Sequence, residues 1–360
     1  MTFDDVGPKP ATKASGKTDD LSNRFSLSDI TADTIPAVRN LISDVMLDIP
    51  YYLSDHKPKM IEAVIKEANR VYRLWCSHNP GFEDNGRVHL IAHSLGSVMA
   101  LDILSNQPTH VFKPPNPKHK PTKTPDNIFE FDTSSLFLCG SPAGFFLLLN
   151  RASLLPRRGR DKPNTSSEDL KAGVTGEAGT YGCLAVDNLY NIMHYNDPIA
   201  YRINACVDVA YAANLQAATV PSAASTWLQS IGSVFRKASI AATTANAGGA
   251  AGTLMEPLRA ERPSIAKMPS TIEMETHDFS REEVAEKKFF ALNDNGQVDW
   301  FLSSGGGPLE IQYLNMLGAH SSYWTLQDFV RFLVVEIGRR EGREGTLVGM
   351  RAVKRVWGKK

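Results

Sequence analysis

The pattern of apolar positions switches repeatedly between two periods along the chain. Short continuous apolar runs are typical of strands buried on both faces, and apolar residues three and four apart are typical of helices. The alternation of the two patterns predicts an α/β fold. The predicted strands are 88–92, 135–139 and 189–193, and the predicted helices are 37–53, 60–75, a run ending near 106, 143–150, 308–318 and 325–338.

A turn signal near the C-terminal end predicts one further element. The sequence Asn-Asp-Asn-Gly at 293–296 separates two apolar runs, 289–292 and 298–302. Two such runs joined by an Asn/Gly turn are typical of a β-hairpin. We therefore expect two strands here.

Polar and low-complexity segments divide the chain. They predict a flexible lead at 1–36, a domain at 37–340 and a basic tail at 341–360. Within the domain, 152–186 and 212–280 are poor in large apolar residues and are interpreted as long loop insertions.

Composition excludes some classes of function. The 39 Lys and Arg residues balance 39 Asp and Glu residues, so the net charge gives no reason to expect nucleic-acid binding. The first 20 residues lack an apolar stretch, and the most apolar run, 136–149, is too short to span a membrane. The four widely spaced cysteines are expected to be free thiols, which favours a cytoplasmic location.

The sequence Ala92-His-Ser-Leu-Gly96 is the candidate for the site chemistry. It matches the G-x-S-x-G nucleophile elbow with Ala in the first position, between a buried strand and a helix. The pattern predicts Ser94 as nucleophile and the Leu95 N–H as oxyanion donor, with small neighbours such as Gly96 letting the backbone pass close. His89 and His93 lie at a strand end without a third ligand, so we interpret His93 as packing in the elbow, not as a metal ligand.

Several further motifs occur in a fixed order after this elbow. With it, they resemble the DDHD-domain-containing intracellular phospholipases A1, which prefer phosphatidic acid. The resemblance covers about 40–340 outside the two insertions, and the four letters of the domain name fall on Asp197, Asp299, His320 and Asp328. The motifs are HLIAHSLGS (89–97), LFLCGSPAG (136–144), YNIMHYNDPIAYR (190–202), GQVDW (296–300) and HSSYW (320–324).

The resemblance implies an α/β-hydrolase-like sheet and a serine esterase. The order Ser94, Asp197, His320 is the order of a triad in that fold, with His320 as base and Asp197 as its orienting acid. Asp299 and Asp328 are interpreted as supporting the site. For these two, a helix cap and a buried ion pair to Arg202 or Arg331 stay open, as does a metal site shared with Asp197 and His320, which would conflict with His320 as base. We assign no metal and no cofactor.

The expected reaction is hydrolysis of an acyl ester of glycerophospholipids such as phosphatidic acid. A soluble carboxylesterase for small esters shares the elbow. Two segments predict peripheral contact with an anionic membrane: the amphipathic stretch 227–235 and the basic residues after 338. The latter are Arg339, Arg340, Arg343, Arg351, Lys354, Arg355, Lys359 and Lys360.

One expected feature is missing upstream of the elbow. The second oxyanion donor of the family follows an apolar strand that ends in His-Gly, and no His-Gly occurs in 1–88. We therefore expect the sheet to lack its N-terminal strands. The alternative function is a truncated, weakly active or inactive module that binds lipid membranes, because one lost donor costs about a hundredfold to a thousandfold in turnover.

Overall fold

The computed structural model describes residues 48–111, 127–160, 162, 174–222, 269–302 and 318–355, without the side chains of 269–280. By its internal contacts the chain divides into Met1–Val45 and Met46–Lys360, and every described residue belongs to the second unit.

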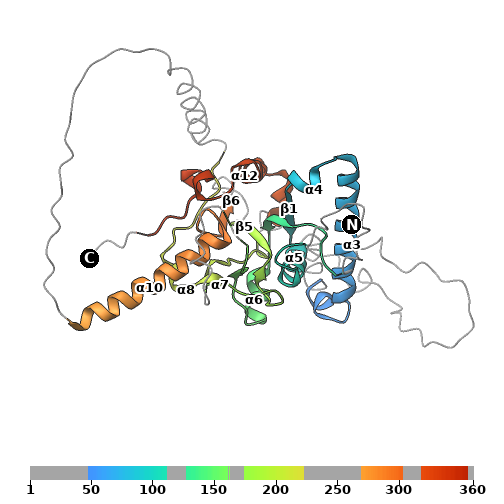
Figure 1. Cartoon of the computed structure of the whole chain (residues 1–360). Coiled ribbons are helices and arrows are strands. Elements are labelled where there is room, and N and C mark those ends of the chain that lie inside the picture. Colours follow the sequence, from blue (N-terminus) through green and yellow to red (C-terminus); the bar gives the residue numbers. More distant parts are fainter. Residues whose placement is uncertain are drawn as a thin grey trace, which may run out of the picture. The chain divides into compact units, whose positions relative to one another are not determined.

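Four parallel strands form the central sheet (Figure 1). They are β1 (Val88–His93), β2 (Thr133–Cys139), β5 (Val186–His194) and β6 (Asp299–Leu302), in the order β1-β2-β5-β6. The three strands predicted from apolar runs are confirmed. Because all four run in the same direction, their last residues meet at one edge, which we call the carboxyl edge, and their first residues meet at the amino edge.

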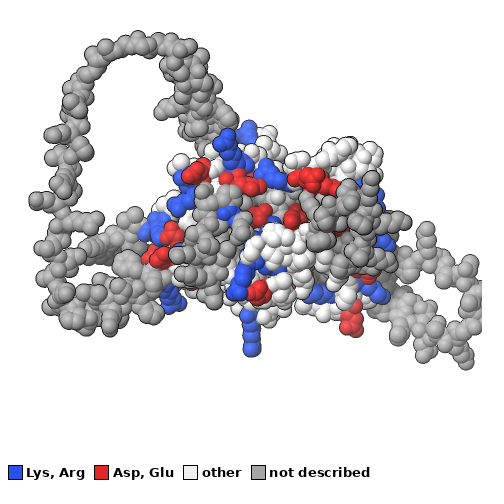
Figure 2. All heavy atoms as spheres, in the orientation of Figure 1, with Lys and Arg blue, Asp and Glu red and all other residues white. Residues whose placement is uncertain are grey.

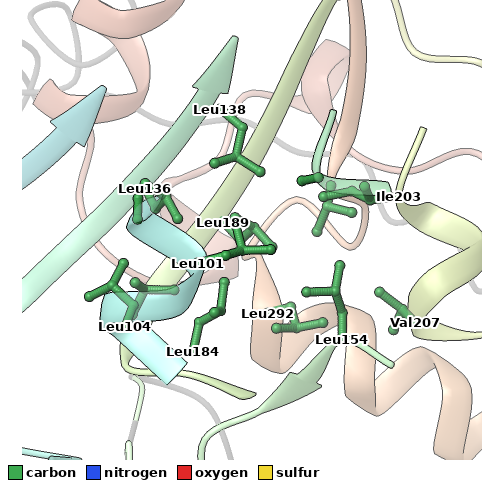
Figure 3. Close-up of a cluster of buried hydrophobic side chains, with 14 of the residues drawn as sticks. Leu101, Leu104, Leu136, Leu138, Leu154, Leu184, Leu189, Ile203, Val207 and Leu292 are labelled. Atoms are coloured by element: carbon green, nitrogen blue, oxygen red, sulfur yellow. The ribbon is translucent and has the colours of Figure 1, made fainter. Parts of the chain in front are cut away.

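Alternate side chains of each strand enter different cores. Leu136 and Leu138 of β2 belong to the core that contains α5 (Leu95–Asn106) and α10 (Pro269–Leu292). Figure 3 shows Leu101 and Leu104 of α5 with Leu189 and Leu292 in this cluster. Phe137 and Cys139 belong instead to the core that contains α12 (Gln327–Gly338). Helices thus cover both faces, as the apolar strands require.

Four predicted helices are present, and several further helical elements were not predicted. The latter include α10, whose residues 269–280 lie within the predicted loop insertion 212–280. The predicted helix 60–75 is α3 (Lys57–His78), and 48–53 are also helical. The remaining helical elements are α4 (Phe82–Asn85), α6 (Ala143–Leu149), α7 (Asn204–Val207), α8 (Val209–Asn214), η3 (Ser322–Thr325), η4 (Arg343–Gly345) and η5 (Val348–Met350).

The predicted hairpin is wrong in its first half. Residues 289–292 form the last turn of α10, and only β6 is a strand. Ala285, Phe289 and Leu292 are all buried, at the spacing of one helix face. A four-residue apolar window cannot distinguish a strand from the end of a buried helix. The turn itself is present, and Gly296 adopts φ 77° there.

The interpretation of 152–186 as an external loop is also wrong for the part that is described. Short strands β3 (Leu155–Pro156) and β4 (Cys183–Leu184) pair within it. Arg157 is buried, and its guanidinium donates to four backbone carbonyls, those of Leu104, Ser105, Gln107 and Cys183. These carbonyls include the free C=O groups at the C-terminal end of α5, which explains how a segment with few apolar residues can be buried.

Residues 341–355 are not a separate tail. Met350 is buried in the core beside α12, and the Ala352 N–H donates to the Asn295 carbonyl. Lys354 contacts Glu282 and Glu286 of α10 at 2.9 and 3.1 Å. Basic residues expected to face lipid are therefore partly engaged within the domain. Figure 2 shows acidic and basic side chains interspersed on the described surface in this view.

Some predictions fall on residues outside the described ranges. These are the lead at 1–36, residues 37–47 of the predicted helix 37–53, residues 161 and 163–173 of the insertion 152–186, most of the insertion 212–280 with the stretch 227–235, residues 308–317 of a predicted helix, and 356–360. All four cysteines are described and are free thiols. Among the described helices, none is both long and apolar enough to cross a membrane.

Candidate active site

Ser94 lies at a sharp turn between β1 and α5, at the carboxyl edge. Its backbone has φ 52° and ψ −130°, and Ser94 and Arg151 are the two non-glycine residues with positive φ in the described part of the chain. Such backbone costs about 1–3 kcal/mol and is common at active sites. The turn is held because the Ser94 N–H donates to the Cys139 carbonyl of β2 and the Ser97 N–H to the Ser94 carbonyl. This is the geometry expected of a nucleophile elbow.

Gly96 does not have the packing role expected for it. A Cβ added there would meet no atom within 4 Å. Close packing occurs instead at Gly140, which follows β2 with φ 57°. A Cβ at Gly140 would lie 2.8 Å from Asp197 Oδ2 and 3.0 Å from His320 Nδ1. Gly140 is therefore the glycine that the site requires.

The structure brings Ser94, His320 and Asp197 together in one hydrogen-bonded chain. His320 Nε2 lies 3.0 Å from Ser94 Oγ, and His320 Nδ1 lies 3.0 and 3.1 Å from the two oxygens of Asp197. His320 and Asp197 are buried. This arrangement can take a proton from the serine hydroxyl while the carboxylate orients the imidazole.

Asp197 is held as a carboxylate. Its burial disfavours the charge, but the hydrogen bonds from His320, Tyr323 and the Ile199 N–H outweigh this effect and lower the pKa of Asp197 below its ordinary value. The Ile199 N–H donates at 2.9 Å across the turn that Pro198 helps to form.

One residue in this cluster, Tyr323, was not among the predicted site residues. Its hydroxyl donates to Asp197 Oδ2 at 2.7 Å and accepts from the His194 N–H at 2.9 Å. Tyr323 lies in the motif HSSYW (320–324), but the motif does not indicate that its hydroxyl contacts Asp197.

His93 packs in the elbow, as its position predicts. Its ring lies 4.6 Å from the ring of His320, and its Nε2–H donates to the His320 carbonyl at 2.6 Å. Burial lowers the pKa of His93, so the neutral form with a proton on Nε2 fits this contact. His93 therefore links the nucleophile turn to the backbone of the histidine.

Asp299 lies away from His320, at the start of β6. It accepts from Asn191 Nδ2 at 2.8 Å and from the N–H groups of Ile203 and Asn204 at 3.0 and 2.9 Å. Burial raises the pKa of this carboxyl. Asp299 thus fixes the segment that follows the Asp197 turn through backbone bonds, and not through an ion pair with Arg202.

Asp328 lies in the first turn of α12, 4.0 Å from Arg331. An acid there favours the helix dipole, which is one of the two structural roles left open by the sequence. The four residues of the domain name do not converge on one point. Within the described ranges, no three His, Cys, Asp or Glu side chains are grouped so as to hold a metal ion.

Comparison with known proteins identifies the family. The model of the DDHD domain matches residues 129–267 and 235–338, which together cover more than half of the 360 residues. The chain belongs to the DDHD-domain family. The resemblance drawn from the motifs is therefore confirmed. The family match contains Asp197, Asp299, His320 and Asp328, whereas Ser94 precedes it.

Several relatives are named as phospholipases. The chain is 28% identical over 326 residues to a probable mitochondrial phospholipase of Schizosaccharomyces pombe, covering 87% of this chain and 40% of the relative. It is 26% identical over 324 residues to a probable mitochondrial phospholipase of Saccharomyces cerevisiae, covering 87% and 37%. It is 26% identical over 215 residues to the intracellular phospholipase A1 of Caenorhabditis elegans, covering 48% and 23%. The chain thus spans about two fifths of the length of the yeast relatives. No solved structure matches it.

Proposed function

We propose that this DDHD chain is a serine esterase that hydrolyses an acyl ester of glycerophospholipids, with phospholipase A1 action on lipids such as phosphatidic acid. The observation that carries the proposal is the hydrogen-bonded chain Ser94–His320–Asp197, with both contacts of His320 at 3.0 Å. The strained backbone of Ser94 and the phospholipase names of the relatives support it.

In the proposed reaction, Ser94 Oγ attacks the acyl carbonyl while His320 Nε2 takes the hydroxyl proton. The C–O bond to the glycerol then breaks, and the imidazolium gives the proton to the departing glycerol oxygen. A water molecule attacks the acyl-serine and gives a proton to His320, which returns it to Ser94 as the fatty acid leaves. Asp197 stabilises the imidazolium in both halves of the reaction.

Leu95 is the proposed first oxyanion donor. It is the first residue of α5, and its N–H therefore has no acceptor within the helix. The lack of the family's second donor stays a prediction. No described strand precedes β1, which forms one edge of the sheet.

The proposed substrates are found in membranes. An acyl ester of a phospholipid lies in a bilayer, so a peripheral contact with anionic lipid belongs to the proposal. Lys354 and Arg339 form ion pairs within the domain, which argues against the C-terminal segment as the site of membrane contact. The cytoplasmic location stays a prediction, and two relatives are named mitochondrial.

Replacement of Ser94 by Ala tests the function. We expect wild-type protein to release fatty acid from phosphatidic acid vesicles and to bind a fluorophosphonate probe covalently. The Ser94→Ala variant should lose both, with hydrolysis reduced by about a thousandfold or more. Ser77→Ala, which removes an exposed hydroxyl of α3 that bonds the Leu74 carbonyl, is the control for labelling. Unchanged hydrolysis by Ser94→Ala would refute the assignment.

Two alternatives give different outcomes in the same assay. The inactive membrane-binding module, which the missing upstream strand motivates, predicts vesicle binding without labelling of Ser94. The soluble carboxylesterase predicts labelling and cleavage of short-chain esters without hydrolysis of vesicles.

A further inference from the structure

The turn that carries His320 makes a second contact with Asp197. Tyr323 lies three residues after His320 and belongs to η3. Its side chain is fully buried. Its hydroxyl is used twice, as donor to Asp197 Oδ2 and as acceptor for the N–H of His194, the last residue of β5. One hydroxyl thus joins the acid to the end of the sheet.

The contacts of Asp197 show what this hydroxyl adds. Oδ1 accepts from the Ile199 N–H at 2.9 Å and lies 3.0 Å from His320 Nδ1. Oδ2 accepts from Tyr323 at 2.7 Å and shares His320 Nδ1 at 3.1 Å. Without the hydroxyl of Tyr323, Oδ2 would keep only the shared histidine contact in the part of the chain that the structure describes. The carboxylate could then rotate away from the bidentate geometry.

The other titratable groups that face Asp197 carry no compensating charge. They are His93, His194 and Cys139, besides His320 and Tyr323. Burial lowers the pKa of both His93 and His194, which favours their neutral forms. Burial raises the pKa of the Cys139 thiol to about 12. The side-chain donors to Asp197 are therefore His320 and Tyr323.

We propose that Tyr323 is a positioning residue that holds the Asp197 carboxylate in its bidentate contact with His320 Nδ1. This inference rests on the proposed function of Ser94, His320 and Asp197. His320 and Tyr323 lie on the same turn, 320–323, and both contact Asp197. Any shift of this turn removes the base from Ser94 and the hydroxyl donor from Asp197 together.

The variant Tyr323→Phe removes the hydroxyl and keeps the ring. The matched control is Tyr190→Phe, because Tyr190 is also fully buried and also donates to a carboxylate at 2.7 Å, that of Glu336. Each variant loses a buried bond to a charged acceptor and a bond from an N–H donor, that of His194 or that of Arg339, so a loss of stability alone would affect them alike. The readouts are the rate of fluorophosphonate labelling of Ser94 across pH 5–9, and kcat and KM for a soluble short-chain ester.

We expect Tyr323→Phe to lower the labelling rate and kcat by about tenfold to a hundredfold, the range for a bond to a charged group, with KM unchanged. Tyr190→Phe should leave the labelling rate and kcat close to those of the wild type. Unchanged values in Tyr323→Phe, or an equal loss in Tyr190→Phe, would overturn the inference.

A second measurement avoids deletion of the hydroxyl, in case Tyr323→Phe does not fold. Protein grown with 3-fluorotyrosine keeps the hydroxyl but has more acidic phenols, which changes the strength of the bond to Asp197, so the labelling rate should change. The same protein with Tyr190→Phe should show the same change, and an unaltered rate contradicts the inference. Absence of labelling in wild-type protein would refute the proposed function and this inference with it. Labelling that Ser94→Ala abolishes but Tyr323→Phe leaves unaltered would refute this inference alone.

Discussion

Buried carboxylates have different kinds of partner at the amino edge and at the carboxyl edge of the sheet. At the amino edge, Asp294 contacts Arg339 at 3.0 Å and Lys162 at 3.4 Å, and Glu336 contacts Arg339 at 2.7 Å. At the carboxyl edge, Asp197 has no Lys or Arg partner among the described residues. Its donors are an imidazole, a phenol and a backbone N–H.

This difference has a chemical reason. A permanent cation beside Asp197 would already neutralise the carboxylate, so less would be gained when His320 becomes positive during the reaction. Neutral donors fix the carboxylate and leave its attraction for the imidazolium in place. At the amino edge no charge has to develop, and lasting ion pairs compensate burial. Buried charge therefore serves stability at one edge and is available to chemistry at the other.

The largest expected effect is a loss of kcat caused by a substitution at the carboxyl edge. In Asp197→Asn the shape is kept but the charge is lost and the wrong tautomer of His320 is favoured. We expect kcat for a soluble ester to fall about ten-thousand-fold. The thermal unfolding midpoint should stay close to that of the wild type. A loss below about tenfold would contradict the assignment of Asp197 as the orienting acid.

An Asp-to-Asn substitution at the amino edge should lower stability and leave the site chemistry unchanged. Asp294→Asn leaves the buried Arg339 and Lys162 without this carboxylate, and removing one partner of a buried pair costs about 3–5 kcal/mol. We expect the free energy of unfolding in urea to fall by about 3 kcal/mol. The pH midpoint of Ser94 labelling should not change. A shifted midpoint in folded Asp294→Asn would show that the two edges are coupled.

The smallest expected effect concerns His89, the second residue of β1 and thus near the amino edge. Unlike His320, it has no carboxylate partner among the described residues, where its buried Nδ1 also has no hydrogen bond. Burial, with a smaller contribution from Arg87, lowers the pKa of His89 to about 4 from its ordinary 6.5. The unfolded chain therefore binds a proton that the folded chain does not between these values. This contribution to stability is complete above about pH 6.5 and is lost as the pH falls toward 4.

Between pH 7 and pH 5 this loss should amount to about 1 kcal/mol, after a discount for the partial exposure of the ring. His89→Leu should flatten the pH dependence of the urea midpoint in that range. Equal slopes for the variant and the wild type would exclude His89 as the cause.

The sequence predicted β2 and β5 well because their apolar runs are buried on both faces of a parallel sheet. It also predicted β1, although β1 is only partly buried and Ile91 is 40% exposed. It failed at 289–292, where four apolar residues fit either period, and at Arg157, where burial depends on carbonyls that only the fold brings together.

For the candidate site, the residues Ser94, Asp197 and His320 could be named because local turn signals and the family motifs mark them. Tyr323 could not, because its role depends on a bond across 126 positions to Asp197. Gly140 was noticed as the end of a strand, but the need for glycine there comes from Asp197 and His320 folding over it. Contacts between segments decide these positions, and a single sequence does not display them.

The sequence separations within the site predict when the site forms during folding. Ser94 and His320 are 226 positions apart, and His320 and Asp197 are 123 apart. Contacts of such long range form late, after the loops between them have closed. We therefore expect Ser94 to become reactive only after the segment that carries His320, 226 positions later in the chain, has joined the sheet.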